Sequence, residues 1–261
     1  MTYIDTHAHL DQQEFDDDRR GVIARARRAG VEHIQCVGVT AASSELAVEL
    51  AQSHPEIFAA VGIHPNSAAE SEGGAWDRVL ALLARPRVVA IGETGLDRHW
   101  DFTPWEQQKE YFDRHLRLAQ QRDLPVIIHC REAEADVLAM LREAAARGPL
   151  RGVIHAFSGD AAMAAECLEL GLYVGFAGNV TYSNRKFQPL RAAAAGIPRD
   201  RLLLETDSPY LVPHPLRGKR DRNEPSLVLL TAQALADLRG QDIAELAADT
   251  TANARELFRL G

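Results

Sequence analysis

Short runs of apolar and β-branched residues recur along the whole chain, and helix-length amphipathic segments separate them. Eight runs can be counted, and they begin near Tyr3, Glu32, Ile57, Arg87, Pro125, Arg151, Leu172 and Arg201. Their spacing of about 20 to 40 residues is typical of a strand followed by a crossover helix, the repeating unit of a parallel sheet.

The segments between these runs carry helical patterns. We expect helices over residues 16–29, 42–53, 76–84, 104–122, 133–147 and 161–170, followed by two closing helices over 227–238 and 243–258. Several patterns end at glycine, and Gly30, Gly148 and Gly171 are expected to adopt the left-handed conformation that terminates a helix.

Eight strand–helix units without a change of composition between them favour one α/β domain over residues 1–261. An open, doubly wound sheet is one solution, but a closed (β/α)₈ TIM barrel with an extra C-terminal helix is favoured. In a barrel, the carboxyl ends of all strands meet on one face, so polar residues far apart in sequence can form one site.

Composition excludes several classes of protein. The N-terminal residues lack the pattern of a secretory signal, and no apolar run approaches the roughly 20 residues that span a membrane. The three cysteines are widely separated, which predicts neither a disulfide framework nor a thiolate zinc site and fits a cytoplasmic protein. The formal net charge of −8 argues against a long duplex footprint, so any nucleic-acid contact should be local.

The first apolar run ends in two histidines, His7 and His9, at alternate positions. Strand alternation points both imidazoles to the same side, into the barrel. They are either buried histidines satisfied by hydrogen bonds or metal ligands. The second interpretation is favoured, because buried imidazoles are costly without partners.

Three further runs end in residues of the same chemical kind. Glu93 follows the fourth run, and His129 and His155 follow apolar triplets in the fifth and sixth. Glu93 is either half of a structural salt bridge or a carboxylate that bridges two cations. A single histidine would more often belong to the core, but two at matching strand positions favour a metal site.

The eighth run ends in Glu205 and Asp207, again at alternate positions. Asp207 is predicted to be a metal ligand and to accept a proton from the attacking water. Glu205 is predicted either to contact a metal ion or to support another ligand. His64, after the third run, is predicted to contact substrate, to support another ligand or to bind a metal ion itself.

Imidazoles and carboxylates without thiolates suit Zn²⁺, Mn²⁺ or Mg²⁺, and the ligands suffice for two ions with a water held between them as nucleophile. Asp207 and Glu93 are therefore the expected catalytic residues.

Six segments together resemble the TatD family of metal-dependent deoxyribonucleases, which belongs to the amidohydrolase-like superfamily. They are Asp-Thr-His7-Ala-His9-Leu, Gly-Ile-His64-Pro, Gly-Glu93-Thr-Gly-Leu-Asp, Pro-Val-Ile-Ile-His129, His155-Ala-Phe-Ser-Gly and Glu205-Thr-Asp207-Ser-Pro-Tyr. The resemblance extends over essentially the whole chain and implies a (β/α)₈ barrel that hydrolyses DNA phosphodiesters, commonly as a 3′-5′ exonuclease. It also implies that His7, His9 and Asp207 hold one ion and that His129 and His155 hold another, with Glu93 bridging them.

The chain departs from the family pattern at Asn66, where a second histidine is common, at Glu132, where Asp is usual, and in two extra residues within 217–225. We expect these differences to affect substrate preference and to leave the metal ligands untouched.

Substrate contacts are expected on the loops that follow the strands. Arg131, Arg217, Lys219 and Arg220 are candidates for phosphate binding, and the run Arg98-His99-Trp100 is similarly placed. Charged loops of this kind are also common on any solvated surface.

Trp100, Tyr182 and Tyr210 could stack on unpaired bases or cap the barrel core. The expected substrate is DNA, as single strands or strand ends, and the expected role is DNA repair or degradation by a monomer. A small-molecule ester, lactone or amide hydrolase is the alternative enzyme. A metal-stabilised binding module is the alternative without catalysis.

Overall fold

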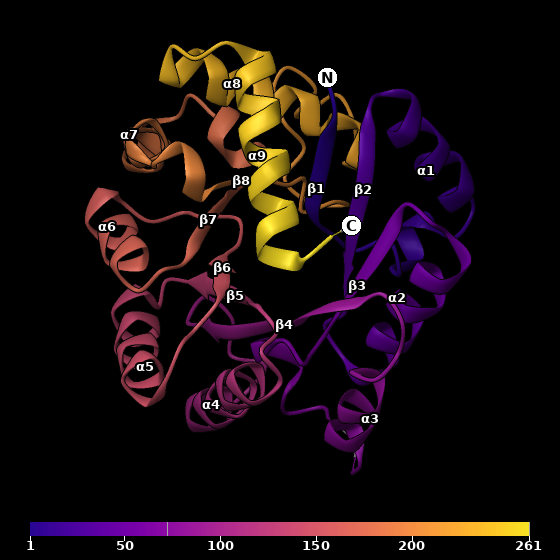
Figure 1. The fold of residues 1–261 in the computed structure, drawn as a ribbon, viewed down its shortest axis with the longest axis vertical. Helices are drawn as coiled ribbons and strands as arrows, with labels where there is room; N and C mark the ends of the chain where they lie inside the picture. Colours follow the sequence, from indigo (N-terminus) through magenta and orange to yellow (C-terminus); the bar gives the residue numbers. More distant parts are fainter. Residues whose placement is uncertain (72, 261) are drawn as a thin grey trace.

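A computed structural model describes residues 1–71 and 73–260 of the chain (Figure 1). Its eight strands form one parallel sheet in sequence order: β1 Tyr3–Ala8, β2 Val31–Val37, β3 Ile57–Val61, β4 Val88–Asp97, β5 Val126–Arg131, β6 Gly152–Ile154, β7 Tyr173–Phe176 and β8 Leu202–Leu204. Each strand begins within one residue of its expected start, which confirms the strand–helix pattern read from the sequence.

The sheet curls into a nearly closed barrel, and its first and last strands meet just beyond their ends. Ala8 pairs with Ser208 in a parallel bridge. The amide of His9 donates to the carbonyl of Ser208 over 2.7 Å, and the amide of Asp207 donates to the carbonyl of His7 over 2.9 Å. The prediction of a barrel is therefore confirmed, and the seam between its ends lies beside the candidate ligands.

Helices follow the strands and surround the barrel (Figure 1). The α-helices of the described residues are α1 Arg19–Arg28, α2 Ala41–Ser53, α3 Ala75–Leu82, α4 Trp105–Arg122, α5 Glu134–Arg147, α6 Ala161–Glu169, α7 Gln188–Gly196, α8 Val228–Arg239 and α9 Ile243–Phe258. Short 3-10 turns occupy several loops, among them η2 Pro65–Ser67 after β3 and η3 Gly178–Thr181 after β7.

The sequence analysis missed α7. This helix begins with Pro189 in its first turn and continues through four alanines, and Leu190, Ala193 and Ala194 are its buried residues. Its apolar face is short, so its periodicity is weak, although proline at a helix start and alanine inside it are both favourable.

The glycine predictions hold at two of three positions. Gly30 and Gly171 have φ of 89° and 80°, in the left-handed region that favours glycine. The expectation for Gly148 was wrong, because its φ of 160° and ψ of 178° are those of extended backbone. The chain therefore leaves α5 at Gly148 without a left-handed turn.

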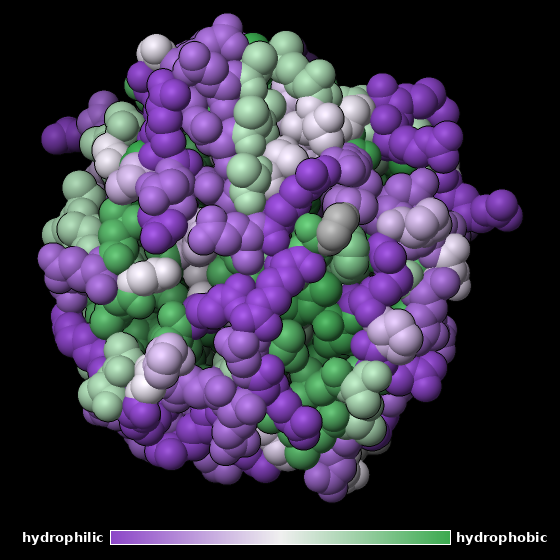
Figure 2. Space-filling model, in the orientation of Figure 1, coloured by the Kyte–Doolittle hydropathy of each residue, from purple (hydrophilic) through white to green (hydrophobic). Residues whose placement is uncertain are grey.

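The interior of the barrel is apolar at the end that α9 covers. One side chain from each strand contributes to this cluster, which also includes Ala254, Leu257, Phe258 and Leu260. Figure 1 shows α9 lying across the barrel, and Figure 2 shows mainly hydrophilic side chains on the face that includes it, with hydrophobic ones visible between helices. The extra C-terminal helix thus closes one end of the barrel and leaves the other end for polar residues.

No helix among the described residues combines the length and the apolar character needed to cross a membrane.

Replacing Phe258 with alanine should lower the free energy of unfolding by about 3 to 5 kcal/mol, because its ring is 2% exposed and packs on the inner cluster. Urea unfolding followed by circular dichroism would measure the loss. Glu256→Gln, at an exposed position on the same helix, should change stability by less than about 0.5 kcal/mol. Equal stabilities of the two variants would contradict the proposed closure by α9.

Candidate metal centre

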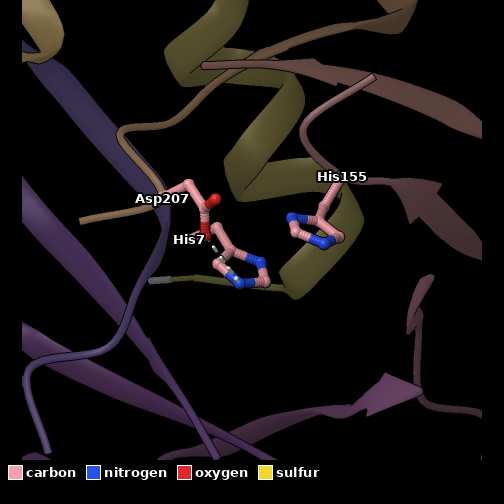
Figure 3. A group of neighbouring side chains, drawn as sticks. All are labelled: His7, His155 and Asp207. Carbon is pink, nitrogen blue, oxygen red and sulfur yellow. Dashed lines mark ion pairs between the residues drawn. The ribbon is translucent and has the colours of Figure 1, made fainter. Parts of the chain in front are cut away.

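The carboxyl ends of β1, β4 and β8 bring a first group of ligand atoms together. The Nε2 atoms of His7 and His9 lie 3.2 Å apart. Glu93 Oε2 lies 3.4 Å from His7 Nε2 and 3.7 Å from His9 Nε2, and Asp207 Oδ1 lies 3.7 and 3.5 Å from the same atoms. Figure 3 shows Asp207 and His155 on either side of the His7 ring.

A second group surrounds the other oxygen of Glu93. Glu93 Oε1 lies 2.7 Å from His155 Nε2, 2.9 Å from His129 Nδ1 and 3.5 Å from His64 Nε2. His155 Nε2 and His129 Nδ1 are 3.4 Å apart. The two oxygens of one carboxylate therefore face two separate sets of imidazoles, which is the arrangement that a bridging ligand needs.

The local backbone explains this convergence. Gly95 has φ of 140°, and a Cβ added there would overlap the carbonyl oxygen of His129, so β4 and β5 approach more closely than another residue would allow. Asp207 has φ of 54°, a left-handed conformation that is unfavourable for aspartate and typical of functional sites.

Six residues predicted as ligands thus lie together at one end of the barrel. Three overlapping sets have ligand atoms within 4.8 Å of one another: His7, His155 and Asp207; His7, His9 and Glu93; and His64, Glu93 and His129.

The electrostatics of the cluster favour added positive charge. Burial lowers the pKa of His7 to about 4 and that of His64 to about 3. Burial also disfavours charged His9 and His155, but the neighbouring carboxylates outweigh it and raise their pKa to about 9 and about 10. The carboxylate of Glu93 is 3% exposed, and although burial alone would raise its pKa, His155, His64 and His129 hold that pKa well below its usual range. Buried carboxylates in this setting require cations beside them.

The donor set fits divalent metal ions. His9 Nδ1 lies 2.8 Å from the carbonyl oxygen of Val37, which can only accept, so this nitrogen donates, and Nε2 is the atom that faces the cluster and would bind a metal ion on losing its proton. Imidazole nitrogens and carboxylate oxygens without a thiolate are the ligands expected of Zn²⁺ or Mn²⁺. Glu93 and the five histidines around it contain enough ligand atoms for more than one ion.

His64 carries its proton on the nitrogen that faces the centre. The amide of Asn66 donates to His64 Nδ1 over 3.1 Å, so the proton of the neutral ring is on Nε2, the atom that faces Glu93. In this form His64 is a hydrogen-bond donor toward the centre.

Glu205 lies behind His155. Its Oε1 accepts from the amide of Ala156 and lies 3.8 Å from His155 Nδ1. Its Oε2 and His155 Nδ1 are buried without a hydrogen-bond partner among the described residues. Burial raises the pKa of Glu205 to about 8. This geometry favours support of His155 over direct participation in the first group.

The predicted substrate residues are on loops or, for Arg131, at the last position of β5, and their surroundings differ. Arg131 is exposed, and its guanidinium lies 5.7 Å from the Trp100 ring centre. Arg217 and Lys219 are also exposed, with the Arg217 guanidinium 3.8 Å from the Tyr182 ring centre. Arg220 lies 3.6 Å from Glu224, so part of its charge is already balanced.

Among the aromatic candidates, Trp100 and Tyr210 are 44% and 49% exposed, whereas Tyr182 is 4% exposed. Of the two roles considered for Tyr182, stacking on bases is therefore excluded and a packing role is favoured. It packs against Phe187 and donates to the carbonyl of Val212, so it holds loops in place.

One other expectation needs correction. Arg98 is bound to Asp136 and packed on Trp105, which leaves it poorly placed for phosphate. At Asn66, where the chain departs from the family pattern, the backbone amide donates to His64 Nδ1 and the side chain donates to Asp97 Oδ2 over 2.9 Å, and neither partner is one of the six predicted ligands.

Sequence reasoning missed Asp97 and Phe102. Asp97 belongs to the quoted Gly-Glu-Thr-Gly-Leu-Asp segment, four residues after Glu93, and this even spacing along a strand places it on the same side. Phe102 carries no signal beyond its position two residues after Trp100.

Known proteins resemble this chain over nearly its full length. Residues 4–259 match the family described as TatD related DNase. The chain is 44% identical to the uncharacterized metal-dependent hydrolase YabD of Bacillus subtilis (strain 168) over 259 residues, covering 98% of this chain and 99% of the relative. It is 40% identical to the 3'-5' ssDNA/RNA exonuclease TatD of Erwinia tasmaniensis over 260 residues, covering 98% and 100%.

A solved structure is also similar to this chain over nearly its full length. The crystal structure of YJJV, a TatD homolog from Escherichia coli K12, has a TM-score of 0.92 and 31% identity, covering 99% of this chain and 98% of its own.

Adding Mn²⁺ or Zn²⁺ at about 100 times its dissociation constant should raise the melting temperature by about 5 to 10 °C, because binding to the folded state adds about 2.7 kcal/mol. Differential scanning calorimetry would measure the shift. Glu93→Gln should lose most of it, whereas Glu70→Gln, at an exposed position, should keep it. A full shift in Glu93→Gln would contradict the bridging role.

Proposed function

The chain belongs to the TatD-related DNase family of metal-dependent hydrolases, and we propose that it removes nucleotides from the 3′ ends of single-stranded DNA. The observation that carries the proposal is Glu93, whose two oxygens face separate groups of imidazoles at the open end of the barrel. A relative of 40% identity is named for 3′-5′ exonuclease action on ssDNA and RNA.

We propose a centre for two divalent ions, with His7, His9 and Asp207 as ligands of one, His129 and His155 as ligands of the other, and Glu93 between them. Bound there, such ions would polarise the scissile phosphate and lower the pKa of a water. Zn²⁺ and Mn²⁺ suit the nitrogen-rich set better than Mg²⁺ does.

The chain's own residues complete the chemistry. Asp207 is proposed to accept the proton of the attacking water, since its Oδ1 lies within 3.7 Å of both His7 and His9. His64 is proposed to donate its Nε2 proton in a hydrogen bond to a phosphate oxygen. Glu205 is proposed to orient His155 from behind.

Phosphate binding is assigned to Arg131, Arg217 and Lys219, whose side chains are exposed and form no ion pair among the described residues. Arg220 is a weaker candidate because of Glu224. Localised arginines beside an acidic body suit a short contact with a strand end.

Exposed aromatic rings favour a single-stranded substrate. The rings of Trp100 and Phe102 stack with centres 5.3 Å apart and planes 12° apart, and they are 44% and 60% exposed. Tyr210, 49% exposed, lies 6.0 Å from the His9 ring. Rings of this kind can stack on unpaired bases, which a duplex hides.

We also propose that the protein acts as a cytoplasmic monomer in DNA repair or degradation. The three cysteines are unpaired, which is compatible with a reducing compartment.

Alanine in place of Glu93 or His129 should lower the hydrolysis of 3′ ends by at least about 1000-fold with the fold retained, because each removes a ligand from the centre. Metal-reconstituted protein would be incubated with end-labelled single- and double-stranded DNA, RNA and a panel of small esters and amides. Faster turnover of an ester or amide than of DNA would favour the small-molecule hydrolase. Wild-type rates in both variants would contradict the proposed centre.

Trp100→Ala should weaken binding of a single-stranded oligonucleotide by about 5- to 150-fold, since stacking is worth about 1 to 3 kcal/mol per base. Fluorescence anisotropy with the metal chelated would measure affinity without cleavage. Trp100→Tyr should restore most of the affinity, and Leu46→Ala, at a 47% exposed position on α2, should leave it unchanged. Equal affinities of Trp100→Ala and Leu46→Ala would contradict stacking at this site.

A further inference from the structure

We propose that Asp97 is a positioning residue that sets the tautomer of His129 and thereby presents the Nδ1 lone pair of this ring to the metal centre. The inference rests on the proposed function only in that the centre binds divalent ions. Asp97 is the last residue of β4 and is 1% exposed.

The carboxylate of Asp97 is fully engaged on the side away from the centre. Its Oδ1 accepts from the backbone amides of His99 and Trp100 over 2.8 and 3.1 Å. Its Oδ2 lies 2.9 Å from the donating side-chain amide of Asn66 and 3.1 Å from His129 Nε2. With four hydrogen-bond partners, neither oxygen of Asp97 is free to bind a metal ion. Asp97 instead holds the neighbouring groups in place.

The bond to Asp97 determines which nitrogen of His129 keeps its proton when a metal ion is bound. An ionised carboxylate only accepts hydrogen bonds, so His129 Nε2 must donate to Asp97. Nδ1 faces the carboxylate of Glu93, and once a divalent ion takes the place of a proton between them, Nδ1 carries the lone pair. Nδ1 is the atom that lies 2.9 Å from Glu93 Oε1 and 3.4 Å from His155 Nε2. In the opposite tautomer, a lone pair would face the carboxylate and the proton would occupy the centre.

His9 is oriented in the same way, with the roles of its two nitrogens exchanged. Its Nδ1 donates to the carbonyl of Val37, and its Nε2 faces the centre. The two rings therefore need opposite tautomers, and an acceptor behind each ring selects the right one. Such partners typically change metal affinity by about 10- to 100-fold.

Asp97 also connects the centre to the proposed base-stacking rings. The amide that it binds belongs to Trp100, whose ring stacks on Phe102. Asn66, bound to its other oxygen, contacts His64 through its own backbone amide. One carboxylate thus fixes His129, the loop after β4 and the turn after β3 relative to one another.

Asp97→Asn tests the proposal with little change of size. The two fixed backbone donors at His99 and Trp100 would attract the amide oxygen, so the NH₂ group would face His129 Nε2 and force the opposite tautomer. We expect zinc affinity, measured by competition with a chelator, to fall by about 10- to 100-fold. Asp101→Asn, an exposed carboxylate in the same loop, should keep wild-type affinity.

Nuclear magnetic resonance supplies the readout that a purely structural role would not change. In zinc-loaded protein with ¹⁵N-labelled histidine, the Nε2 proton of His129 should lie at low field and exchange slowly with solvent, because Asp97 accepts it, with the signal assigned from its loss in His129→Gln. The wild-type spectrum suffices even if Asp97→Asn does not fold. A proton on Nδ1, an Nε2 proton in fast exchange, or wild-type zinc affinity in a folded Asp97→Asn, would overturn the proposal.

These measurements do not use hydrolysis. A protein that gives the expected tautomer and affinities but cleaves no nucleic acid would support the role of Asp97 while contradicting the proposed nuclease.

Discussion

The burial of one carboxylate organises the functional end of this barrel. Glu93 is almost inaccessible to water, and its two oxygens contact imidazoles from β1, β5 and β6 and from the turn after β3. An ionised carboxylate is costly in such a position unless cations or strong hydrogen-bond donors surround it. The histidines provide this compensation, and together with Glu93 they form a set of ligands suited to divalent ions.

One end of the barrel stabilises the fold, and the other end carries the candidate functional residues. At one end, a side chain from every strand packs with the last turns of α9, and this apolar cluster contributes to the stability of the fold. At the other end, polar residues replace the apolar ones, and Asp207 adopts an unfavourable backbone conformation. The apolar end can offset the cost of the polar end because both belong to the same eight strands.

Behind three of the rings lies an acceptor that belongs to neither of the two groups of ligand atoms. Val37 serves His9 through its carbonyl, Asp97 serves His129, and Glu205 lies behind His155 at a longer distance. Through the amides of His99 and Trp100, Asp97 joins the centre to the loop after β4. Changes in that loop are therefore coupled to the orientation of His129 through these hydrogen bonds.

The sequence by itself determined the strand order, the strand starts, most helices and the grouping of polar residues at strand ends, because these follow from periodicity and from the geometry of parallel strands. It also identified the family, since six spaced motifs occur in order. It did not reveal α7, whose apolar face is short, or the extended conformation of Gly148.

Only the tertiary structure decided which candidate side chains are accessible and which way each ring faces. Tyr182 is buried and Arg98 is paired, although both are on loops that looked suitable for substrate. The role of Asp97 depends on the approach of β4 to β5 and on two loop amides, none of which is encoded by local sequence spacing. Hydrogen bonds between distant segments set the tautomers, and such contacts exist only once the barrel has closed.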